Sequence, residues 1–473
     1  MLITLNERIF RIISEVSHIN EIEVYLVGGF VRNWFLQKKS KDIDILVIGD
    51  GIELAEKVAK VLNTSKVVVY KNFGTAQINY RNYKIEFVGA RKESYQHNSR
   101  NPIVETGSFR DDIFRRDFTI NAIAVSLNNK SYGEVIDLTN GLDDLKNNLI
   151  RTTSAPLITF SDDPLRMLRA IRFATQLNFT IEPITLEGIK SNANRIEIIS
   201  KERIVDELHK ILLSSLPSYG FNLLDQTGLL PYILPELNNL KGIDKQENKA
   251  HKDNFYHTLQ VVDQLKEKTN KLWLLWGGLL HDIGKYPTKK FIPATGWTFH
   301  GHEVVGAKMV EKLFKRLNMP VNEVLPYVKK LVSLHLRPIS LVKEEVTDSA
   351  VRRLIFEAGN DLEDLLLLAE ADITSKNEQK VRLYLKNFKL LRKKIEEIEE
   401  KDRIRNFQPP ISGEEIMEWF NLSPCKIVGD LKNQVKDAIL DGIIPNEKNA
   451  AIHYLIKIVK EKGLEFNEEK IPK

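Results

Sequence analysis

The sequence predicts an α+β head, built on a small mixed or antiparallel sheet with helices, followed by an all-helical remainder. Between residues 22 and 127, short runs of Val, Ile and Tyr alternate with polar residues and end at Gly or Asn turns, which is typical of strands. From residue 162 onward, apolar residues recur almost everywhere with the period of a helix. The 473 residues are too many for one hydrophobic core, so we expect several domains.

The same periodicities give the elements in order. In the head we expect helices at 1–20, 30–37 and 52–63, and strands at 22–27, 42–48, 66–70, 75–80, 83–89 and 119–127. Residues 91–116 are polar and irregular, which predicts a mobile loop, and residues 137–145 predict a polar turn. Helices are expected at 163–177, 183–194, 201–214, 218–228 and 376–405. We place the head at 1–155, a helical neck at 156–240, a histidine-rich helical domain at 241–375 and a partly basic helical tail at 376–473.

Composition excludes several classes of protein. The single cysteine, Cys425, excludes an internal disulfide framework and a cysteine-rich zinc site, and it fits a reducing cytoplasm. Charged residues within the first 16 positions argue against a signal peptide. The longest apolar run, Leu272–Leu280, is too short to cross a bilayer. We therefore expect a cytoplasmic protein without a membrane segment, whose net charge of +5 is too small to indicate nucleic-acid binding by itself.

Two aspartates in one predicted strand are the first candidate site. Asp42 and Asp44 stand two apart, so their carboxylates project from the same face of the strand. Neighbouring acids repel unless a cation lies between them, and Mg²⁺ takes one or two carboxylates together with substrate phosphates. The turn at Gly28 and Gly29 lets backbone N–H groups approach a triphosphate closely. The pattern predicts metal-assisted phosphoryl transfer, the alternative being a solvated strand edge and an ordinary turn.

Other parts of the head and neck can complete this site. Glu86, on the predicted strand 83–89, can supply a third carboxylate, with a strand-surface glutamate as the alternative. Arg115 and Arg116 precede Asp117 and fit a phosphate or ribose contact, although a salt bridge would explain one of them.

An arginine-rich helix follows at residues 163–177. Arg166, Arg169 and Arg172 recur every three residues with no acid between them, so they fan over one face of the helix. Arginines on such a face repel one another unless they bind acceptors, so phosphate or nucleobase partners are favoured. Asp163 and Arg166 together can offer an acceptor and a donor to the Watson–Crick edge of a base. The alternative is a solvated basic helix.

The ordered motifs resemble the class II tRNA nucleotidyltransferase and bacterial poly(A) polymerase family over about the first 237 residues. They are Gly28 to Arg32, Asp42 to Asp44, Arg115 to Ala122, Asp137 to Leu145, Asp162 to Phe173 and Ile199 to Leu208. The resemblance implies that Asp42 and Asp44 bind catalytic Mg²⁺ with Glu86 as third acid, that Gly29 and Arg32 contact the triphosphate, and that Arg115 and Arg116 lie where ribose and phosphate are contacted. It also implies that Asp163 and Arg166 read CTP or ATP as a protein template, with Arg169 and Arg172 as further nucleotide contacts. Asn33 departs from the family, which usually has Asp there, and Gly89-Ala90-Arg91 stands where a Thr-Phe-Arg run is usual.

A second constellation lies in the helical region. Its members are His257, His281, Asp282, His302, His335 and Asp372. Imidazoles and carboxylates suit a divalent metal, and helices that each deliver one or two ligands can converge inside a bundle. The order resembles the HD phosphohydrolase superfamily, which implies a core site of His257, His281, Asp282 and Asp372, with His302 and His335 permitting a second metal ion; Mg, Mn, Fe, Ni and Co are the candidates. The alternative is that these are ordinary histidines, hydrogen-bonded in the core or exposed on the surface, that bind no metal.

The predicted helix at 376–405 carries seven cations and no acid between Lys380 and Lys394. They are Lys380, Arg382, Lys386, Lys389, Arg392, Lys393 and Lys394. RNA phosphate contacts and a solvated helix face explain this pattern about equally well.

The two resemblances together imply a template-independent enzyme that adds CCA to the 3′ end of tRNA from CTP and ATP, with an appended HD phosphohydrolase site. In some relatives with such a fusion, the HD domain hydrolyses phosphomonoesters or 2′,3′-cyclic phosphates. The alternatives are a poly(A) polymerase, a CC-only or A-only adding enzyme, and an RNA-binding HD phosphohydrolase with an inactive transferase half. Poly(A) polymerases of this kind usually carry a strongly basic tail in place of an HD domain, which favours tRNA. The sequence leaves open the oligomeric state and the role of residues 406–473.

Overall fold

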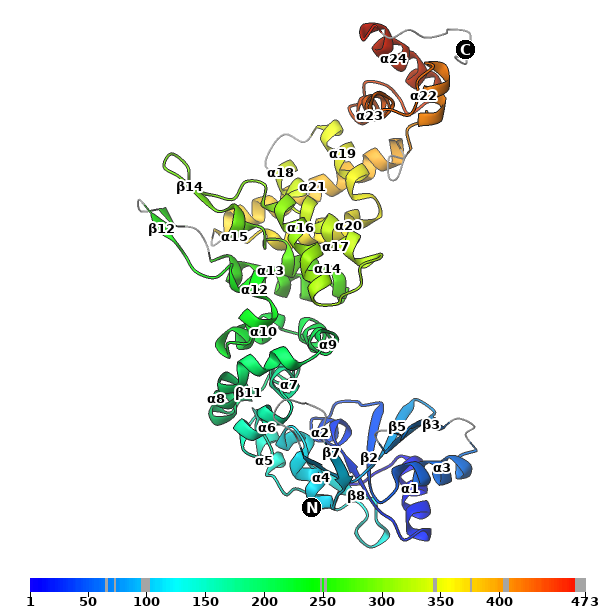
Figure 1. The fold of residues 1–473 in the computed structure, drawn as a ribbon, viewed down its shortest axis with the longest axis vertical. Coiled ribbons are helices and arrows are strands. Elements are labelled where there is room, and N and C mark those ends of the chain that lie inside the picture. Colours follow the sequence, from blue (N-terminus) through cyan, green and yellow to red (C-terminus); the bar gives the residue numbers. More distant parts are fainter. Residues whose placement is uncertain are drawn as a thin grey trace. The chain divides into compact units, whose positions relative to one another are not determined.

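The computed structural model divides the chain into two compact units, Met1–Asn238 and Asn239–Lys473, and each is described by itself (Figure 1). The residues described are 1–63, 67–71, 74–94, 103–246, 249–250, 253–342, 347–374, 377–402 and 408–463. The finer division into four domains stays a prediction.

A seven-stranded mixed sheet forms the head, in the order β3-β4-β5-β2-β1-β8-β9. Its strands are β1 Glu23–Val27, β2 Asp42–Ile48, β3 Val67–Tyr70, β4 Thr75–Tyr80, β5 Tyr83–Gly89, β8 Ala124–Ser126 and β9 Val135–Ile136. Strands β2 and β5 pair in parallel, and the other neighbours pair antiparallel. Helices α1 Arg8–Ile19 and α3 Gly51–Val61 pack against each other, and α3 packs on the sheet. The predicted mixed sheet with helices is confirmed.

Side chains along β2 alternate between the hydrophobic core on one face and carboxylates on the other. Ile43 and Ile45 are fully buried, whereas the alternate residues Asp42 and Asp44 are exposed and half-buried. The parallel neighbour β5 repeats the pattern, with Ile85 and Phe87 also fully buried. The period of two therefore fixes which side of these strands carries the acids.

The segment 91–116 differs from the predicted irregular loop. Its described residues form a two-stranded hairpin, β6 Arg91–Ser94 and β7 Ile103–Thr106, followed by helix α4 Phe109–Arg115. The Ser108 hydroxyl caps α4 by accepting from the Asp111 N–H, and the Asp111 carboxylate accepts from the Ser108 N–H in return. A Ser followed three residues later by an acid is a helix-start signal, so this helix was detectable in the sequence.

Two other predictions in the head need correction. The strand expected at 119–127 is a 3-10 turn, η2 Thr119–Asn121, followed by the short strand β8. The polar turn expected at 137–145 leads into a short helix, α5 Gly141–Lys146, because the Asp137 carboxylate accepts from the Gly141 and Leu142 N–H groups and so satisfies the first turn.

Helices make up nearly all of the rest of the first unit, as predicted. They are α6 Pro156–Asp162, α7 Leu165–Leu177, α8 Pro183–Asn192, η4 Ala193–Ile198, α9 Lys201–Leu212, α10 Pro217–Gln226, α11 Leu230–Ile233 and α12 Pro235–Asn238. The remaining elements are the short turn η3 Asn129–Ser131 and the parallel pair β10 Leu149–Ile150 and β11 Thr180–Ile181. Helices α7 and α9 pack together through Leu168, Ile171 and Leu208, all fully buried.

The second unit is a helical bundle with two small hairpins. Its helices are α13 Asn254–Lys268, α14 Leu272–Leu280, α15 Lys285–Thr288, α16 His302–Arg316, α17 Val324–Leu334, α18 Leu336–Leu341, α19 Asp348–Ala358, η5 Gly359–Asp361, α20 Leu362–Asp372, α21 Glu378–Asp402, α22 Gly413–Trp419, α23 Lys426–Leu440 and α24 Lys448–Glu461. The hairpins pair β12 Lys245–Gln246 with β13 Lys249–Ala250, and β14 Lys290–Ile292 with β15 Gly296–Thr298.

Helix α14 lies at the centre of this bundle. It contacts α13, α17 and α20, and a helix that is apolar all round belongs in such a buried position. A Cβ at Gly278 would lie 2.4 Å from the Leu265 side chain, so the glycine permits close packing of α14 on α13. Among the described residues, no helix is both long and apolar enough to cross a membrane.

A buried ion pair joins the two neck helices α7 and α9. Arg172 donates from Nε to Glu207 Oε2 at 2.5 Å, and the exposed fractions of the two side chains are 11% and 4%. Changing Glu207 to Gln leaves a buried guanidinium without its counter-charge, so we expect the free energy of opening of α7 and α9 to fall by about 3 kcal/mol. Hydrogen–deuterium exchange of the amides in these helices measures this change.

The matched control is Lys210→Gln. Lys210 pairs with the same carboxylate at 3.1 Å but is 48% exposed, so its loss should cost less than about 1 kcal/mol. Equal protection losses in the two variants would contradict a structural role for the Arg172–Glu207 pair.

Candidate functional site

Three carboxylates stand side by side on the strands at the centre of the head sheet. In the parallel register of β2 and β5, Asp44 lies beside Glu86 and Asp42 lies beside Lys84. The predicted third acid therefore comes from the neighbouring strand. Glu86 Oε1 accepts from Lys84 Nζ at 2.9 Å. Among the described residues, the groups of three or more potential metal ligands whose ligand atoms lie within 4.8 Å of one another are all in the second unit. The carboxylates of Asp42, Asp44 and Glu86 therefore share a face of the sheet without converging on one point.

The chemistry of these donors fits a hard divalent cation. Burial raises the pKa of Asp44, and the nearby charges of Glu86 and Asp42 raise it further against the opposing effect of Arg116. A cation bound to these oxygens removes the mutual repulsion, and oxygen donors of this kind are what Mg²⁺ prefers.

Gly28 is required where the chain turns from β1 into α2 Gly29–Phe35. Its φ of 75° lies in the left-handed region, and a Cβ there would lie 2.5 Å from Asp44 Oδ2 and 3.7 Å from Arg116 Nη1. Only glycine lets the backbone come this close to the carboxylate. The same distances place the Arg116 guanidinium near Asp44, so cation and anion meet at this turn.

Arg32 is held by neutral partners. Its Nη1 donates to Asn121 Oδ1 at 2.7 Å, and its Nε and Nη2 donate to Asn33 Oδ1 at 3.1 and 2.9 Å. The guanidinium also lies 5.0 Å from the centre of the Phe173 ring. Burial lowers the pKa of Arg32 to about 10, so the group stays charged at neutral pH. Amide oxygens orient Arg32 without cancelling its charge, which leaves it able to attract an anion.

Arg115 and Arg116 share one buried carboxylate. Arg115 Nε donates to Asp112 Oδ1 at 2.8 Å, and Arg116 Nη2 donates to Asp112 Oδ2 at 2.8 Å, while Asp112 is fully buried. The salt-bridge partner in this segment is therefore Asp112, where the sequence suggested Asp117. Spacings of three and four residues place all three side chains on one side of α4, so this pairing was detectable in the sequence.

The arginines of α7 each have a partner within the protein. Arg166 Nη2 donates to the Arg115 carbonyl at 2.8 Å, Arg169 Nε donates to Asp117 Oδ2 at 2.8 Å, and Arg172 pairs with Glu207. Burial works to raise the pKa of Asp117, but Arg169 and the Asn121 amide lower it overall, so this carboxylate stays charged.

The predicted nucleotide contacts of α7 stay predictions. Arg172 is buried against Glu207, whereas Arg169 is 36% exposed and Arg166 half-buried. At the start of the helix, Asp163 Oδ1 accepts from the Leu165 N–H at 3.1 Å. Sequence reasoning missed Asn121 and Glu207, because each reaches its arginine from a distant element and leaves no local signal.

The six predicted histidines and aspartates of the second unit lie close together in two groups, and Asp282, predicted in the core set, groups with His302 and His335. His257, His281 and Asp372 form one group, and Asp282, His302 and His335 form another, with ligand atoms within 4.8 Å of one another in each group. His257 Nε2 lies 2.9 Å from Asp372 Oδ1, and His302 Nε2 lies 3.4 Å from Asp282 Oδ1. These ligands come from α13, the segment after α14, the start of α16, the end of α17 and the end of α20. Helices far apart in sequence therefore build one buried centre.

The hydrogen bonds of these histidines fit metal binding. Nδ1 of His281, His302 and His335 lies 2.7 to 2.9 Å from the carbonyls of Gly278, Phe299 and Val332. A carbonyl only accepts, so each Nδ1 carries a proton, and each ring presents an Nε2 lone pair when it is neutral. His302 Nε2 and His335 Nε2 face each other at 3.3 Å, and His281 Nε2 is buried without a hydrogen bond. A cation in each of the two ligand groups would satisfy all of these atoms.

Protonation competes with a metal ion at this centre. Burial and the neighbouring His281 lower the pKa of His335 to about 4, so its imidazole is neutral at pH 7. Burial opposes a charge on His281, but Asp282 and Asp372 raise its pKa to about 10. Metal binding at His281 therefore has to displace a proton. Lys285, to which sequence reasoning assigned no role, donates from Nζ to Asp282 Oδ2 at 2.6 Å.

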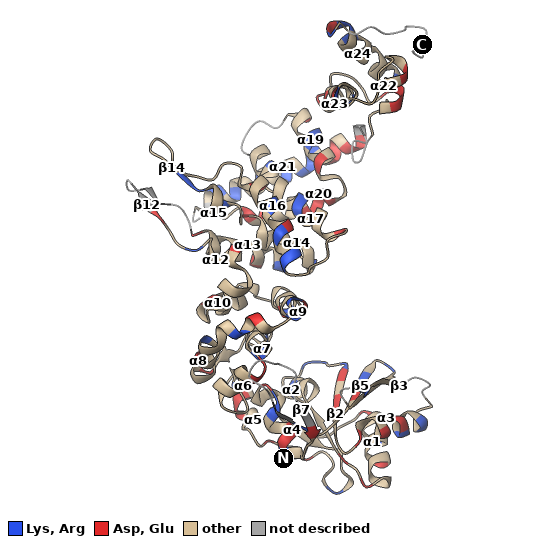
Figure 2. Cartoon of the chain, in the orientation of Figure 1, with Lys and Arg blue, Asp and Glu red and all other residues tan. Residues whose placement is uncertain are grey.

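The predicted basic helix is α21, and part of its charge is used within the unit. Arg392 pairs with Glu363 and Glu370, Lys394 pairs with Asp348, and Lys393 lies 3.7 Å from Glu397 on the same helix. Figure 2 shows both basic and acidic residues along this part of the chain. Lys380, Lys386 and Lys389 are exposed and form no ion pair with any described residue. RNA binding by this helix stays a prediction, and these three lysines are its best candidates.

Comparison with known proteins gives three family matches along the chain. The model described as the Poly A polymerase head domain matches residues 24–151, the one described as a probable RNA and SrmB-binding site of polymerase A matches residues 178–241, and the HD domain matches residues 254–376.

Individual relatives agree with these matches. The A-adding tRNA nucleotidyltransferase of Deinococcus radiodurans is 30% identical over 444 residues, which cover 90% of this chain and 94% of that protein. The CCA-adding enzyme of Limosilactobacillus reuteri is 39% identical over 222 residues, which cover 46% of this chain and 53% of that protein. The solved structure of the Thermotoga maritima CCA-adding enzyme complexed with tRNA has the same fold, with a TM-score of 0.60, 23% identity and coverage of 95% of this chain and 94% of that chain.

The histidine geometry predicts that the second unit gains stability on binding a divalent metal. Mn²⁺ at about 100 times its dissociation constant should stabilise the metal-free, full-length protein by about 2.7 kcal/mol. His335→Ala removes one of the two facing Nε2 atoms and should abolish most of this gain. Thermal unfolding with and without Mn²⁺, together with metal analysis, measures the effect.

His453→Ala is the matched control, because His453 is exposed on α24 and belongs to neither ligand group. It should keep the full response to Mn²⁺. A wild-type protein that neither binds Mn²⁺ nor gains stability would contradict the assignment, as would an unchanged response of His335→Ala.

Proposed function

Because the chain belongs to the tRNA nucleotidyltransferase family, we propose that it adds CCA to the 3′ end of tRNA from CTP and ATP without a nucleic-acid template. The observation that carries this proposal is the pair Asp42 and Asp44, which share one face of β2 beside Glu86, with Gly28 held against Asp44. The resemblance to the A-adding enzyme of Deinococcus radiodurans over nearly its whole length supports nucleotide addition to tRNA, and the resemblance to the CCA-adding enzyme of Limosilactobacillus reuteri supports addition of all three nucleotides. A cytoplasmic location fits this role.

In the proposed reaction, the 3′-hydroxyl of the RNA attacks the α-phosphorus of CTP or ATP. A new phosphodiester bond forms, the bond to the pyrophosphate breaks, and the hydroxyl proton passes to solvent. Asp42 and Asp44 would hold Mg²⁺, which neutralises the charge that develops on the attacking and leaving oxygens. Arg32 and Arg116 carry their positive charge on the same side of the head as Asp44, where it stabilises the triphosphate and the leaving pyrophosphate.

Selection of the base is proposed for the start of α7. Asp163 offers acceptor oxygens and Arg166 offers donors, and Arg166 is oriented by its hydrogen bond to the Arg115 carbonyl. A carboxylate and a guanidinium together can match the acceptors and donors of a Watson–Crick edge. Arg169 and Gly29 are proposed as further nucleotide contacts. A role for Arg172 would be indirect, since Glu207 holds it.

We also propose a metal-dependent phosphohydrolase activity for the second unit, acting on phosphomonoesters or 2′,3′-cyclic phosphates. The six converging ligands and the outward Nδ1 hydrogen bonds support it. Such a site would hold Mg, Mn, Fe, Ni or Co, and the metal would supply an activated water or hydroxide.

The exposed lysines of α21, namely Lys380, Lys386 and Lys389, are proposed to contact RNA phosphates.

The adding reaction can be read directly from product length. Wild-type protein incubated with tRNA that lacks its CCA end, CTP, ATP and Mg²⁺ should add three nucleotides. Asp42→Asn and Asp44→Asn should each lower the rate by about 10³-fold, because the charge that holds the metal is lost. His281→Ala should leave the rate unchanged, since it lies in the other ligand set.

Other product lengths identify other activities. A long A tail indicates a poly(A) polymerase, and one or two added nucleotides indicate a partial adding enzyme. No addition by the wild type would contradict the proposal, as would full addition by the Asp42→Asn and Asp44→Asn variants. Ring opening of a 2′,3′-cyclic phosphate to a phosphomonoester, or release of phosphate from a phosphomonoester, lost in His281→Ala but kept in Asp42→Asn, tests the second activity independently.

The Arg32–Asn33 contact predicts a charge effect on nucleotide affinity. Asn33→Asp gives Arg32 a charged partner in place of a neutral amide, so its attraction for the triphosphate falls. We expect the KM for CTP and ATP to rise about threefold with little change in kcat, which corresponds to about 0.6 kcal/mol. Steady-state kinetics at fixed tRNA concentration measures both constants.

Gln37→Glu is the control, because it adds the same charge at an exposed position two residues after α2. It should not change KM. An equal rise in both variants would show a general charge effect and would refute the specific role of Asn33.

A further inference from the structure

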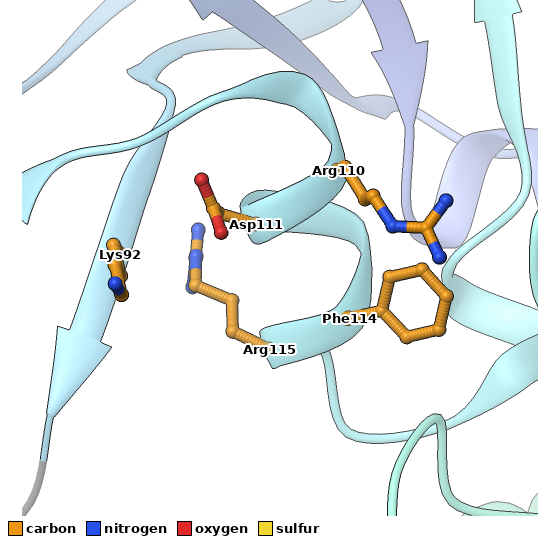
Figure 3. Close-up of a pocket in the computed structure, with 5 residues that line it drawn as sticks. All are labelled: Lys92, Arg110, Asp111, Phe114 and Arg115. Carbon is orange, nitrogen blue, oxygen red and sulfur yellow. The ribbon is translucent and has the colours of Figure 1, made fainter.

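A separate pocket lies between β6 and α4 in the head. It is lined by Lys92, Arg110, Asp111, Phe114 and Arg115, and its volume is about 350 Å³. Figure 3 shows Asp111 and Arg115 extending from the helix toward the strand that carries Lys92, with Arg110 beside Phe114 on the other side of the helix in this view. The volume is at the lower end of the ~300–1,000 Å³ range of ligand pockets, which suits a group about the size of one nucleotide.

The lining of this pocket is cationic. It contains three positive side chains and one carboxylate. The carboxylate of Asp111 is already engaged, because it accepts from the Ser108 N–H at 2.9 Å and from the Ser108 hydroxyl at 2.7 Å in capping α4. Among the described residues, Lys92 and Arg110 form no ion pair, so their charges remain available to an incoming anion.

Arg110 is also preorganised. Its guanidinium carbon lies 4.9 Å from the centre of the Phe114 ring, four residues along the same helix. An aromatic face that supports a guanidinium leaves the edge donors free and reduces the entropy that is lost when they bind a phosphate oxygen. This arrangement favours phosphate recognition over a general surface charge.

The pocket adjoins the transferase site through a shared carboxylate. Asp112 holds Arg115, which lines the pocket, with one oxygen, and it holds Arg116, which lies near Asp44, with the other. A polyanion whose reactive end lies at Asp42 and Asp44 therefore has a second cationic site next to the first. A growing RNA strand carries phosphates beyond its reacting end, whereas a nucleoside triphosphate has all of its negative charge in one short chain of phosphates.

We propose that this pocket binds a backbone phosphate of the substrate RNA, one or more nucleotides before its reacting 3′ end. The inference rests on the proposed tRNA substrate, and it adds a contact that holds the strand during addition. Lys92 and Arg110 supply the charge, and Arg115 couples the pocket to the transferase site.

The test uses the full-length protein carrying Lys92→Gln and Arg110→Gln together. Binding of fluorescent tRNA without its CCA end is measured by anisotropy between 50 and 200 mM KCl, without nucleotides. The dissociation constant should rise about tenfold at low salt, and the slope of its logarithm against log salt should fall by about 0.7, the value for one contact to a single strand. The KM for CTP and ATP and inhibition by pyrophosphate should not change.

A matched control carries Arg81→Gln and Lys130→Gln. Both residues are exposed on the head, and Arg81 lies 5.4 Å from the Tyr80 ring much as Arg110 lies over Phe114. This double variant should bind tRNA as the wild type does. Circular dichroism confirms that both double variants are folded.

Three outcomes would overturn the inference. The first is that the Lys92→Gln, Arg110→Gln variant keeps the tRNA affinity and the salt slope of the wild type. The second is that the control variant loses as much tRNA affinity as the pocket variant does. The third is a change in nucleotide KM or pyrophosphate inhibition with unchanged tRNA affinity, which would assign the pocket to the triphosphate. If the wild type extends tRNA, these outcomes reject the pocket alone; if it neither binds nor extends tRNA, the proposed function fails as well.

Discussion

Two buried carboxylates, Asp112 and Asp117, position the cationic side of the head. Asp112 fixes Arg115 and Arg116, while Asp117 fixes Arg169 and accepts from the Asn121 amide. Removing one partner of a buried pair typically costs about 3–5 kcal/mol, because the remaining charge is left uncompensated. The arginines near the proposed transferase site are therefore oriented before any substrate arrives, which is the condition for strong electrostatic stabilisation of a transferring phosphoryl group.

In the candidate metal centre of the second unit, neutral backbone groups orient the side chains. Backbone carbonyls next to the ligands fix the proton on Nδ1 and so aim each Nε2 inward. The carbonyls belong to residues three positions before their histidines, so the local backbone itself orients each ring. Because the backbone orients these three rings, the carboxylates of Asp282 and Asp372 are not needed for that purpose and can balance the charge of a bound ion.

The two sites differ in what they require from their surroundings. In the head, acids and arginines share a partly open face, which suits a large charged substrate that brings its own phosphates. In the second unit, His281, Asp282 and His335 are almost completely buried, which suits a tightly held metal with access for a small reactive group. The proposed transfer and hydrolysis reactions therefore rest on separate residues, and the chain combines them without sharing a ligand.

Sequence alone determined the features that depend on local periodicity. The period of two placed Asp42 and Asp44 on one face, and the order of histidines and aspartates identified the HD centre that the helices assemble. Tertiary structure decided the partners: Asn121 on Arg32 and Glu207 on Arg172, 35 residues away, while the strand register placed Glu86, already predicted as the third acid, beside Asp44. The arginine face of α7 was predicted to face either substrate or solvent, because local spacing cannot show partners such as Asp117 and Glu207 that come from elsewhere in the chain. Such pairings depend on which elements pack together, and packing follows from burial of the whole core rather than from any short stretch of sequence.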